Sequence, residues 1–320
     1  MKKVSWGVLG TANIALKKVI PAMQSGAFCS IDAIASRSLD QARKAAESLR
    51  IPKAYGSYED LLEDPQIEAV YVPLPNHLHV PWIIKSLAAG KHVLCEKPIS
   101  MNLQEAAFLS EEIKKYPELK VAEAFAYKHH PQWLKVQQLL KEGVIGDMVT
   151  MHTHFSYDQR DPRNVRNQVA FGGGGLLDVG CYAISLARLL FSEEPIRVRG
   201  LMEFDPQFNV DRVASGILRF EKGSATFTCG TQMDRYQCVQ IYGTKGRIAI
   251  LDPFGPPGLE TEVKVFQGEQ MEAITFEKAN AYTLQGDAFS EAIRTNGRLT
   301  PLTDALANMS VIDRLLNAAI

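Results

Sequence analysis

The first 125 residues alternate short apolar runs with segments of helical periodicity. The apolar runs predict strands over residues 4–9, 31–35, 67–74, 92–95 and 120–126, and the periodic segments predict helices over 13–24, 38–49, 77–89 and 102–115. Strands that alternate with helices are typical of a parallel, doubly wound sheet. Pro21 stands inside the first predicted helix, where a proline loses a hydrogen bond and crowds the preceding turn, so we expect a kink there.

Two helix starts carry capping signals. Ser38 followed by Gln41 forms a capping-box pattern, in which each side chain would satisfy a backbone donor of the other residue. Ser57 with Asp60 predicts the start of a further helix.

After about residue 126 the strands follow one another directly. Helices are predicted over residues 132–141 and 176–191, and strands over 148–157, 197–204, 212–220, 224–231, 236–242 and 247–251. Glycine-bearing turns at residues 221–223 and 243–246 join neighbouring strands as hairpins do. We therefore predict an α/β chain with two domains. Residues 1–125 carry the doubly wound sheet, and residues 126–320 carry a large, mostly antiparallel sheet, with C-terminal helices free to pack back on the first domain.

The second predicted sheet has helices for one face only. An apolar face left open needs a partner, which predicts a homodimer or homotetramer formed through this C-terminal sheet. Whether the oligomer is a dimer or a tetramer is left open by the sequence.

Composition narrows the functional classes. The 320 residues include 35 Lys and Arg against 36 Asp and Glu, a net charge of −1, which argues against a nucleic-acid partner. The five cysteines lack a Cys-x-x-Cys pair and fit free thiols in a reducing compartment, so we expect a cytoplasmic protein. No run approaches the roughly 18 uninterrupted apolar residues of a membrane helix, and we expect no membrane partner.

The turn after the first predicted strand is a degenerate dinucleotide-binding fingerprint. Aligning Gly-x-Gly-x-x-Gly/Ala from Gly10 places Ala12 and Ala15 at the second and third glycine positions. Such a turn brings backbone N–H groups and a helix N-terminus to a pyrophosphate, which makes Gly10, Thr11, Ala12, Asn13 and Ile14 candidate cofactor residues.

The end of the second predicted strand bears on the choice of cofactor. An acidic residue there would accept hydrogen bonds from an NAD ribose, but this chain has Ser36-Arg37-Ser38. A guanidinium flanked by two hydroxyls suits a 2′-phosphate, so NADP(H) is preferred and NAD(H) is the alternative. In the other interpretation Arg37 is solvated and Ser38 only caps its helix.

Two further segments follow predicted strands at the edge where such sheets bind ligands. Pro73, Asn76 and His77 are candidate cofactor residues after one strand, and Glu96 and Lys97, before Pro98, are candidates after the next. His77 with His79, and His152 with His154, also suggest metal binding. Neither pair has a third ligand at a typical spacing, so no metal site is predicted.

These motifs together resemble the Gfo/Idh/MocA oxidoreductases over nearly the whole chain. The most specific ones are Glu96-Lys97-Pro98 and Asp178-x-Gly180-x-Tyr182, supported by segments 10–15, 75–79, 122–127 and 174–182. The combination of Tyr182 with Glu123 and the segment from Tyr127 to Gln132 most resembles one NADP-dependent branch of the family. That branch contains D-xylose dehydrogenases and dimeric dihydrodiol dehydrogenases. The inositol dehydrogenase branch has histidine at that position.

The resemblance implies a Rossmann domain and hydride transfer between NADP(H) and a hydroxyl or carbonyl carbon of an aldose, polyol or vicinal diol. It also implies catalytic roles for Lys97 and Tyr182 and a substrate-orienting role for Asp178. Asp178 and Tyr182 are four residues apart, so both can lie on one helix face. A nearby lysine would favour tyrosinate and ease proton removal from a substrate hydroxyl.

Two other functions are weighed beside this one. The first is a non-catalytic NADP(H)-binding sensor or regulatory protein of the same fold, and the second is a metal hydrolase that uses the histidine pairs. Gly172 to Gly175 is interpreted as a flexible lead-in to the following helix. The polar loop before it could contact the substrate or a neighbouring subunit; its side chains are Arg160, Arg163, Asn164, Arg166, Asn167 and Gln168.

Overall fold

The computed structural model describes residues 2–255 and 259–317, which form two compact units. The first unit takes the chain up to Ala126 and adds Asn280–Leu306. The second unit takes Tyr127–Ala279 and the stretch from Ala307 onward. The chain thus leaves its first unit, builds most of the second and then returns.

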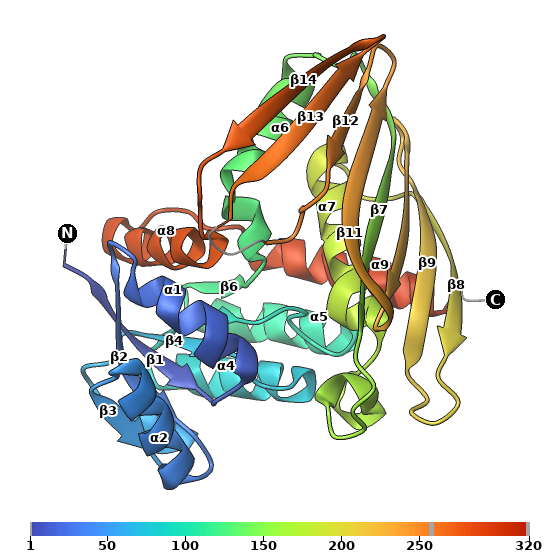
Figure 1. Cartoon of the computed structure of the whole chain (residues 1–320). Helices are drawn as coiled ribbons and strands as arrows, with labels where there is room; N and C mark the ends of the chain where they lie inside the picture. Colours follow the sequence, from blue (N-terminus) through green and yellow to red (C-terminus); the bar gives the residue numbers. More distant parts are fainter. Residues whose placement is uncertain (1, 256–258, 318–320) are drawn as a thin grey trace. The chain divides into compact units, whose positions relative to one another are not determined.

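The first unit is built on a six-stranded parallel sheet (Figure 1). Its strands are β1 (Val4–Leu9), β2 (Cys29–Ala35), β3 (Lys53–Tyr55), β4 (Ala69–Val72), β5 (His92–Cys95) and β6 (Val121–Glu123). The order β3-β2-β1-β4-β5-β6 confirms the predicted doubly wound sheet, and β3 was not predicted. The strand order reverses between β1 and β4, which is where such sheets bind ligands at their carboxyl ends.

The helices of this unit agree with the predicted segments. They are α1 (Ile20–Gln24), α2 (Leu39–Leu49), α3 (Tyr58–Glu63), α4 (His79–Ala88) and α5 (Leu103–Glu112). Ser38 and Ser57 cap α2 and α3 as predicted, because each side chain accepts a hydrogen bond from the backbone N–H three residues later. The capping box at α2 is incomplete: the Gln41 amide oxygen accepts from the Ser36 hydroxyl at 3.3 Å and not from the Ser38 N–H.

Pro21 changes the helix before it in a specific way. Ala15–Val19 form a π-helical turn, and the Ile20 N–H donates to the Ala15 carbonyl. Pro21 then occupies the first turn of α1, where its missing N–H leaves no partner unsatisfied. The expected irregularity is present, and it takes the form of a widened turn rather than a broken helix.

Helix α8 (Ala281–Thr295) packs on β1 and β2 although it lies far along the chain. The Trp6 and Phe289 rings lie 5.3 Å apart and both are fully buried. The Trp6 indole donates to the Ser290 hydroxyl at 3.0 Å, which satisfies a buried polar atom. Asp287 accepts from the N–H groups of Ala27 and Phe28 at 2.9 and 2.8 Å. The first core is therefore closed by a helix that follows the second unit in sequence.

The second unit is built on an eight-stranded, mostly antiparallel sheet (Figure 1). Its strands are β7 (Met148–Asp158), β8 (Arg197–Phe204), β9 (Asp211–Arg219), β10 (Ser224–Gly230), β11 (Gln232–Gly243), β12 (Arg247–Ile250), β13 (Thr261–Gln267) and β14 (Gln270–Phe276). Among these described strands, β7 and β10 alone pair in parallel. This confirms the predicted fold class and adds the hairpin of β13 and β14, which was not predicted.

Helices α6 (Pro131–Lys141) and α7 (Cys181–Phe191) contact this sheet, and α9 (Leu302–Asn317) ends the described chain. A π-helical turn, Leu176–Gly180, leads into α7. The stretch Val169–Phe191 is long and apolar enough to cross a membrane, but 67% of its most apolar window is buried inside the protein. It behaves as the core helix of its unit.

Candidate functional site

The turn after β1 has the backbone geometry that a dinucleotide fingerprint needs. Gly10 adopts a φ of +122°, and a Cβ there would lie 3.1 Å from Leu74 Cδ2. Its N–H donates to the Ala35 carbonyl at 2.9 Å, which ties the turn to the end of β2. Thr11 and Ala12 remain half-exposed where the helix starts. The turn therefore fits a pyrophosphate at a helix N-terminus.

The end of β2 presents a cation beside that turn. The Arg37 side chain is exposed, whereas Ser36 is 5% exposed. The Ser36 hydroxyl donates to Gln41 and accepts from the Ser38 N–H at 3.4 Å. Both serines already form hydrogen bonds at the start of α2. Arg37 is therefore the residue of this segment that is best placed to meet a 2′-phosphate.

The segment after β4 is organised by His79. Both imidazole nitrogens lie 2.7 Å from carbonyl oxygens, Nδ1 from Pro98 and Nε2 from Leu74. Burial lowers the pKa of His79 to about 4. Pro73 is buried, and Asn76 and His77 begin a short 3₁₀ turn at the carboxyl end of the strand. Both ring nitrogens of His79 thus face backbone carbonyls of two loops and are not presented to a metal.

The second histidine pair is also engaged. His152 Nδ1 lies 2.9 Å from the Thr226 hydroxyl, and His154 Nε2 lies 2.9 Å from the Ser156 hydroxyl. Among residues 2–255 and 259–317, no three His, Cys, Asp or Glu side chains gather to hold a metal ion.

Lys97 follows β5 and has its backbone fixed on both sides. Its N–H donates to Glu96 Oε2 at 3.3 Å, and Glu96 Oε1 accepts from the Tyr71 hydroxyl at 2.7 Å. Burial first, and the Glu96 charge second, raise the pKa of Tyr71, so its hydroxyl keeps its proton. Two residues later, the Ile99 N–H donates to Glu123 at 2.8 Å. The lysine is thus held at the carboxyl edge of the sheet, where sheets of this kind bind ligands.

Asp178 lies in the second unit, on the π-helical turn before α7. Its Oδ2 accepts from Arg166 Nε at 2.8 Å and from the Tyr157 hydroxyl. The Asp178 charge raises the pKa of Arg166, and burial followed by the same charge raises the pKa of Tyr157. Both partners therefore act as donors to one carboxylate oxygen.

Tyr182 stands one turn further along the same helix, among aromatic rings. Its ring centroid lies 5.2 Å from Phe254, 5.6 Å from Phe155 and 5.9 Å from Tyr127. The Tyr127 hydroxyl lies 2.9 Å from the Ser185 hydroxyl. Tyr182 is half-buried, so the rings fix its orientation without enclosing it.

The glycine segment before this helix has positive φ angles and close contacts with a buried acid, while its flexibility stays a prediction. Gly172 and Gly174 have φ values of +75° and +114°, and a Cβ on Gly174 would collide with the Asp211 carboxylate. That carboxylate accepts from the Leu176 N–H at 2.6 Å. The glycines are needed so that the backbone can wrap around a buried acid that caps the helix in place of an external anion.

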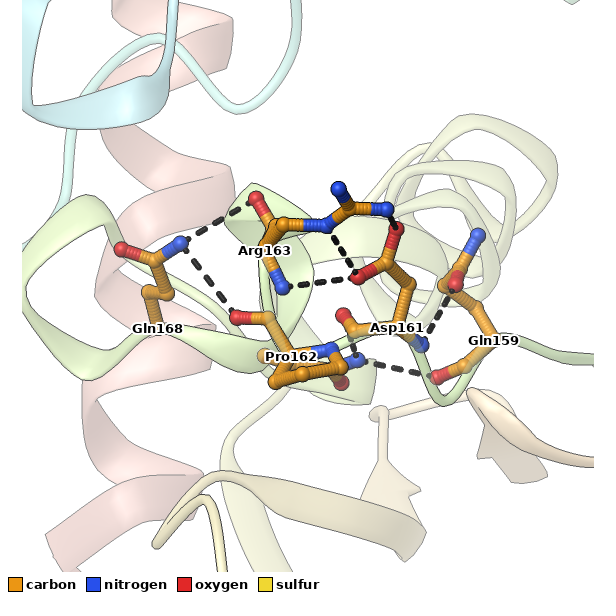
Figure 2. Close-up of polar contacts among 6 residues, drawn as sticks. Gln159, Asp161, Pro162, Arg163 and Gln168 are labelled. Atoms are coloured by element: carbon orange, nitrogen blue, oxygen red, sulfur yellow. Dashed lines mark hydrogen bonds and ion pairs between the residues drawn. The ribbon is translucent and has the colours of Figure 1, made fainter.

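The polar loop after β7 is ordered by its own side chains (Figure 2). Asp161 accepts from the backbone N–H and from the guanidinium of Arg163 at 2.9 and 3.2 Å. The Gln168 amide donates to the carbonyls of Pro162 and Arg163 at 3.5 and 3.2 Å. The Asn167 amide, in a residue only 4% exposed, donates to two more loop carbonyls.

Sequence reasoning did not identify three residues that bear on Asp178. In the sequence, Arg166 is one of several polar loop residues, Tyr157 is the last residue of a predicted strand, and Asp211 directly precedes another predicted strand. Tyr157 had a weak signal, since it is a tyrosine at a strand end. The contacts of all three with the π-helical turn depend on tertiary structure.

Two family models match the chain. Residues 4–142 match a model described as "Oxidoreductase family, NAD-binding Rossmann fold", and residues 133–249 match the "GFO/IDH/MocA C-terminal domain". The predicted family is therefore confirmed over most of the chain.

Characterised and uncharacterised relatives agree with these models. An uncharacterized oxidoreductase of Rhizobium meliloti is 39% identical and covers 100% of this chain and 98% of its own. D-xylose 1-dehydrogenase (NADP(+)) 2 of Haloferax volcanii is 35% identical over 96% of this chain and 94% of its own. A 3-ketoreductase from Actinomadura kijaniata, crystallised with NADP and TDP-benzene, superposes with a TM-score of 0.92 at 29% identity, covering 99% of this chain and 98% of that chain.

Proposed function

The protein belongs to the Gfo/Idh/MocA oxidoreductase family, and on that premise we propose that it oxidises or reduces an aldose, or a related polyol or vicinal diol, with NADP(H). The observation that carries the proposal is Lys97, held by its backbone at the carboxyl end of β5 on the sheet that bears the Gly10 turn. The names of the relatives support sugars and their derivatives as the substrate class.

The cofactor residues come from three strand ends of the first unit. Gly10, Thr11, Ala12, Asn13 and Ile14 would hold the pyrophosphate, and Ser36, Arg37 and Ser38 the 2′-phosphate side. Pro73, Asn76, His77, Glu96 and Lys97 would line the nicotinamide side. When bound, the nicotinamide ring supplies or takes up the hydride.

The proton-handling residues are Lys97 and Tyr182. The Tyr182 oxygen takes the proton from the substrate hydroxyl during oxidation and returns it during reduction. The Lys97 cation favours the tyrosinate form and so lowers the cost of that transfer. Asp178 accepts a hydrogen bond from a second substrate hydroxyl and thereby orients the reacting carbon.

We also propose that the protein is a cytoplasmic homo-oligomer that contacts neither nucleic acid nor membrane. All five cysteines are buried and none is joined in a disulfide, as fits a reducing compartment. Alternate positions of the second sheet place apolar side chains on its open face, namely Leu201, Ile217, Tyr236 and Tyr242, which are 40% to 64% exposed. A second copy of the chain would cover them.

The Lys97→Met variant tests the proposed chemistry. We expect it to lose turnover of the aldose that the wild type accepts, by about 1,000-fold or more, because the proton-transfer pair is broken. The NADPH dissociation constant, followed by nicotinamide fluorescence, should stay within about 3-fold, because most cofactor contacts remain. Lys85→Met is the matched control, since the Lys85 side chain pairs with Glu59 at the surface.

The outcomes separate the competing functions. Tight NADPH binding without turnover of any aldose or polyol by the wild type would favour a non-catalytic sensor. Full turnover by the Lys97→Met variant would remove the catalytic role of the lysine. Binding of neither NADPH nor NADH would contradict the proposed function at its first step.

A further inference from the structure

We propose that Arg166 is a positioning residue of the reaction: together with Tyr157 it fixes the Asp178 carboxylate in the orientation that receives the substrate. The inference rests on the proposed function, because it deepens the role assigned there to Asp178. It adds two residues that neither the family match nor the sequence motifs single out.

The first observation is that two donors converge on a single oxygen of Asp178. Arg166 Nε lies 2.8 Å from Oδ2, and the Tyr157 hydroxyl donates to the same atom. The Asp178 side chain is 13% exposed in this ion pair. A carboxylate held by two donors from different elements has little freedom to rotate, whereas an exposed carboxylate would reorient freely.

The second observation is that the backbone of Arg166 is itself clamped. Its N–H donates to Asn164 Oδ1 at 3.1 Å, and its carbonyl accepts from the Gly174 N–H at 2.9 Å. A Cβ on Gly173 would lie 2.5 Å from that carbonyl, so only glycine allows the close approach. The glycine segment thus joins Arg166 directly to the start of the helix that carries Asp178.

The third observation is the contrast among the three arginines of the loop. Arg160 pairs with Asp158 and Arg163 with Asp161, each two residues away along the chain. The Arg163 side chain is 89% exposed, and such pairs contribute little to stability. Arg166 alone among these three forms its ion pair with a residue outside the loop, twelve positions away, whereas Arg160 adds to its local pair a longer hydrogen bond, at 3.4 Å, to the Gln232 carbonyl.

Tyr157 completes the arrangement from the end of β7. Its pKa is raised mainly by burial and then by the Asp178 charge, so the phenol remains a donor at the pH of the reaction. Tyr182, by contrast, is the tyrosine proposed to exchange a proton with substrate. The two tyrosines near Asp178 therefore have different tasks: Tyr157 orients the carboxylate, and Tyr182 handles the proton.

A fixed carboxylate affects both binding and chemistry. A carboxylate held in one orientation would accept a substrate hydroxyl from one direction, so the reacting carbon would be presented in one orientation. A misplacement of about 1 Å can cost about 100-fold in rate. Removing Arg166 should therefore raise the KM for the sugar and lower kcat, while the first unit continues to bind the cofactor.

The experiment compares four variants of the full chain in steady-state assays with the best aldose found for the wild type. Arg166→Met should lower kcat/KM about 100-fold, with the loss divided between kcat and KM. Arg166→Lys should recover part of this loss because it restores the charge without the planar donor group. Tyr157→Phe should lower kcat/KM about 10-fold because it removes one donor only. Arg163→Met, the matched control, should stay within about 2-fold of the wild type.

NADPH titration and thermal melting of each variant separate a positioning role from a structural one. The inference predicts an NADPH dissociation constant within about 2-fold of the wild type and partial rescue by lysine. If Arg166→Met does not fold, Arg166→Lys and Tyr157→Phe carry the test, since both retain the packing of the site. Wild-type kcat/KM in Arg166→Met, or in those two variants, would overturn the inference alone. A wild type without turnover would remove the proposed function and this inference with it.

Discussion

Arg37 is the residue that we propose to select the cofactor. Its guanidinium is exposed beyond β2, while Ser36 and Ser38 are engaged by the start of α2. We expect Arg37→Asp to weaken NADPH binding relative to NADH by about 10- to 100-fold, because a charge-assisted contact is lost and a carboxylate faces the 2′-phosphate. Paired fluorescence titrations with the two cofactors measure the ratio.

The control for this prediction is Arg43→Asp, which makes the same change of charge on the exposed face of α2. It should leave the NADPH to NADH ratio within about 2-fold of the wild type. An unchanged ratio in Arg37→Asp would show that another residue selects the cofactor.

Individual side chains differ in how far the sequence can predict them. The Ser38 cap follows from neighbouring residues, and the structure contains it. The hydrogen-bond partner of the Gln41 side chain does not follow from neighbouring residues. Its amide oxygen accepts from the hydroxyl of Ser36, which follows a strand, instead of from the Ser38 N–H. The partner of Arg166 could not be predicted for the same reason. In the sequence Arg166 looks equivalent to Arg160 and Arg163, and only the folded chain brings Arg166 to Asp178.

The start of the helix that carries Asp178 contains a buried acid with an unusual pKa. Burial, as the largest cause, raises the pKa of Asp211 to about 7 despite hydrogen bonds from the backbone N–H groups around it. Between about pH 4 and 7 the folded protein therefore binds a proton that the unfolded chain does not bind. The free energy of unfolding falls as pH rises through this range, and the cost of the buried charge is fully present above about pH 7.

Asp211→Asn tests this linkage because the amide cannot ionise but keeps an acceptor for the Leu176 N–H. Urea unfolding at pH 5 and pH 8 should show a larger loss of stability in the wild type than in this variant, by up to roughly 3 kcal/mol. The exposed carboxylate of Asp234 provides the control, and Asp234→Asn should leave the pH dependence unchanged. Equal pH dependence in the wild type and Asp211→Asn would contradict the raised pKa.

Elements with a clear period were predictable, and elements shaped by tertiary contacts were not. The predicted strand over residues 224–231 agrees with β10 to within one residue. The π-helical turns at Ala15–Val19 and Leu176–Gly180 have the same apolar pattern as an ordinary helix, so their hydrogen bonds could not be foreseen. Strand β14 has mostly exposed side chains, which leaves only a weak alternating pattern in the sequence.

At the scale of the whole chain, sequence order and spatial order diverge. Residues 280–306 belong to the first unit although they follow the second. Nothing in the periodicity of residues 281–295 identifies their partner, because an amphipathic helix can cover any apolar face. The fully buried Trp6 depends on these returning residues. Its ring packs against Phe289 of α8, and its indole N–H donates to the Ser290 hydroxyl of the same helix. The core of the first unit therefore depends on chain that lies beyond the second sheet.

The open face of the second sheet is where we propose that copies of the chain meet. Ile217 lies on β9 and is 56% exposed, in register with Thr226 on β10, which in turn pairs with His152 on β7. If a second copy covers this face, a lysine at position 217 would place an unpaired charge in the interface, which is strongly unfavourable.

We therefore expect Ile217→Lys to shift the protein toward smaller species at micromolar concentration, measured by size-exclusion chromatography with light scattering. Leu134→Lys on α6, where the leucine is 58% exposed, is the matched control and should leave the mass unchanged. Both variants should keep the NADPH affinity of the wild type, because the proposed cofactor residues all belong to the first unit. A wild type that is monomeric, or an oligomer unaffected by Ile217→Lys, would show that this face is not where copies of the chain meet.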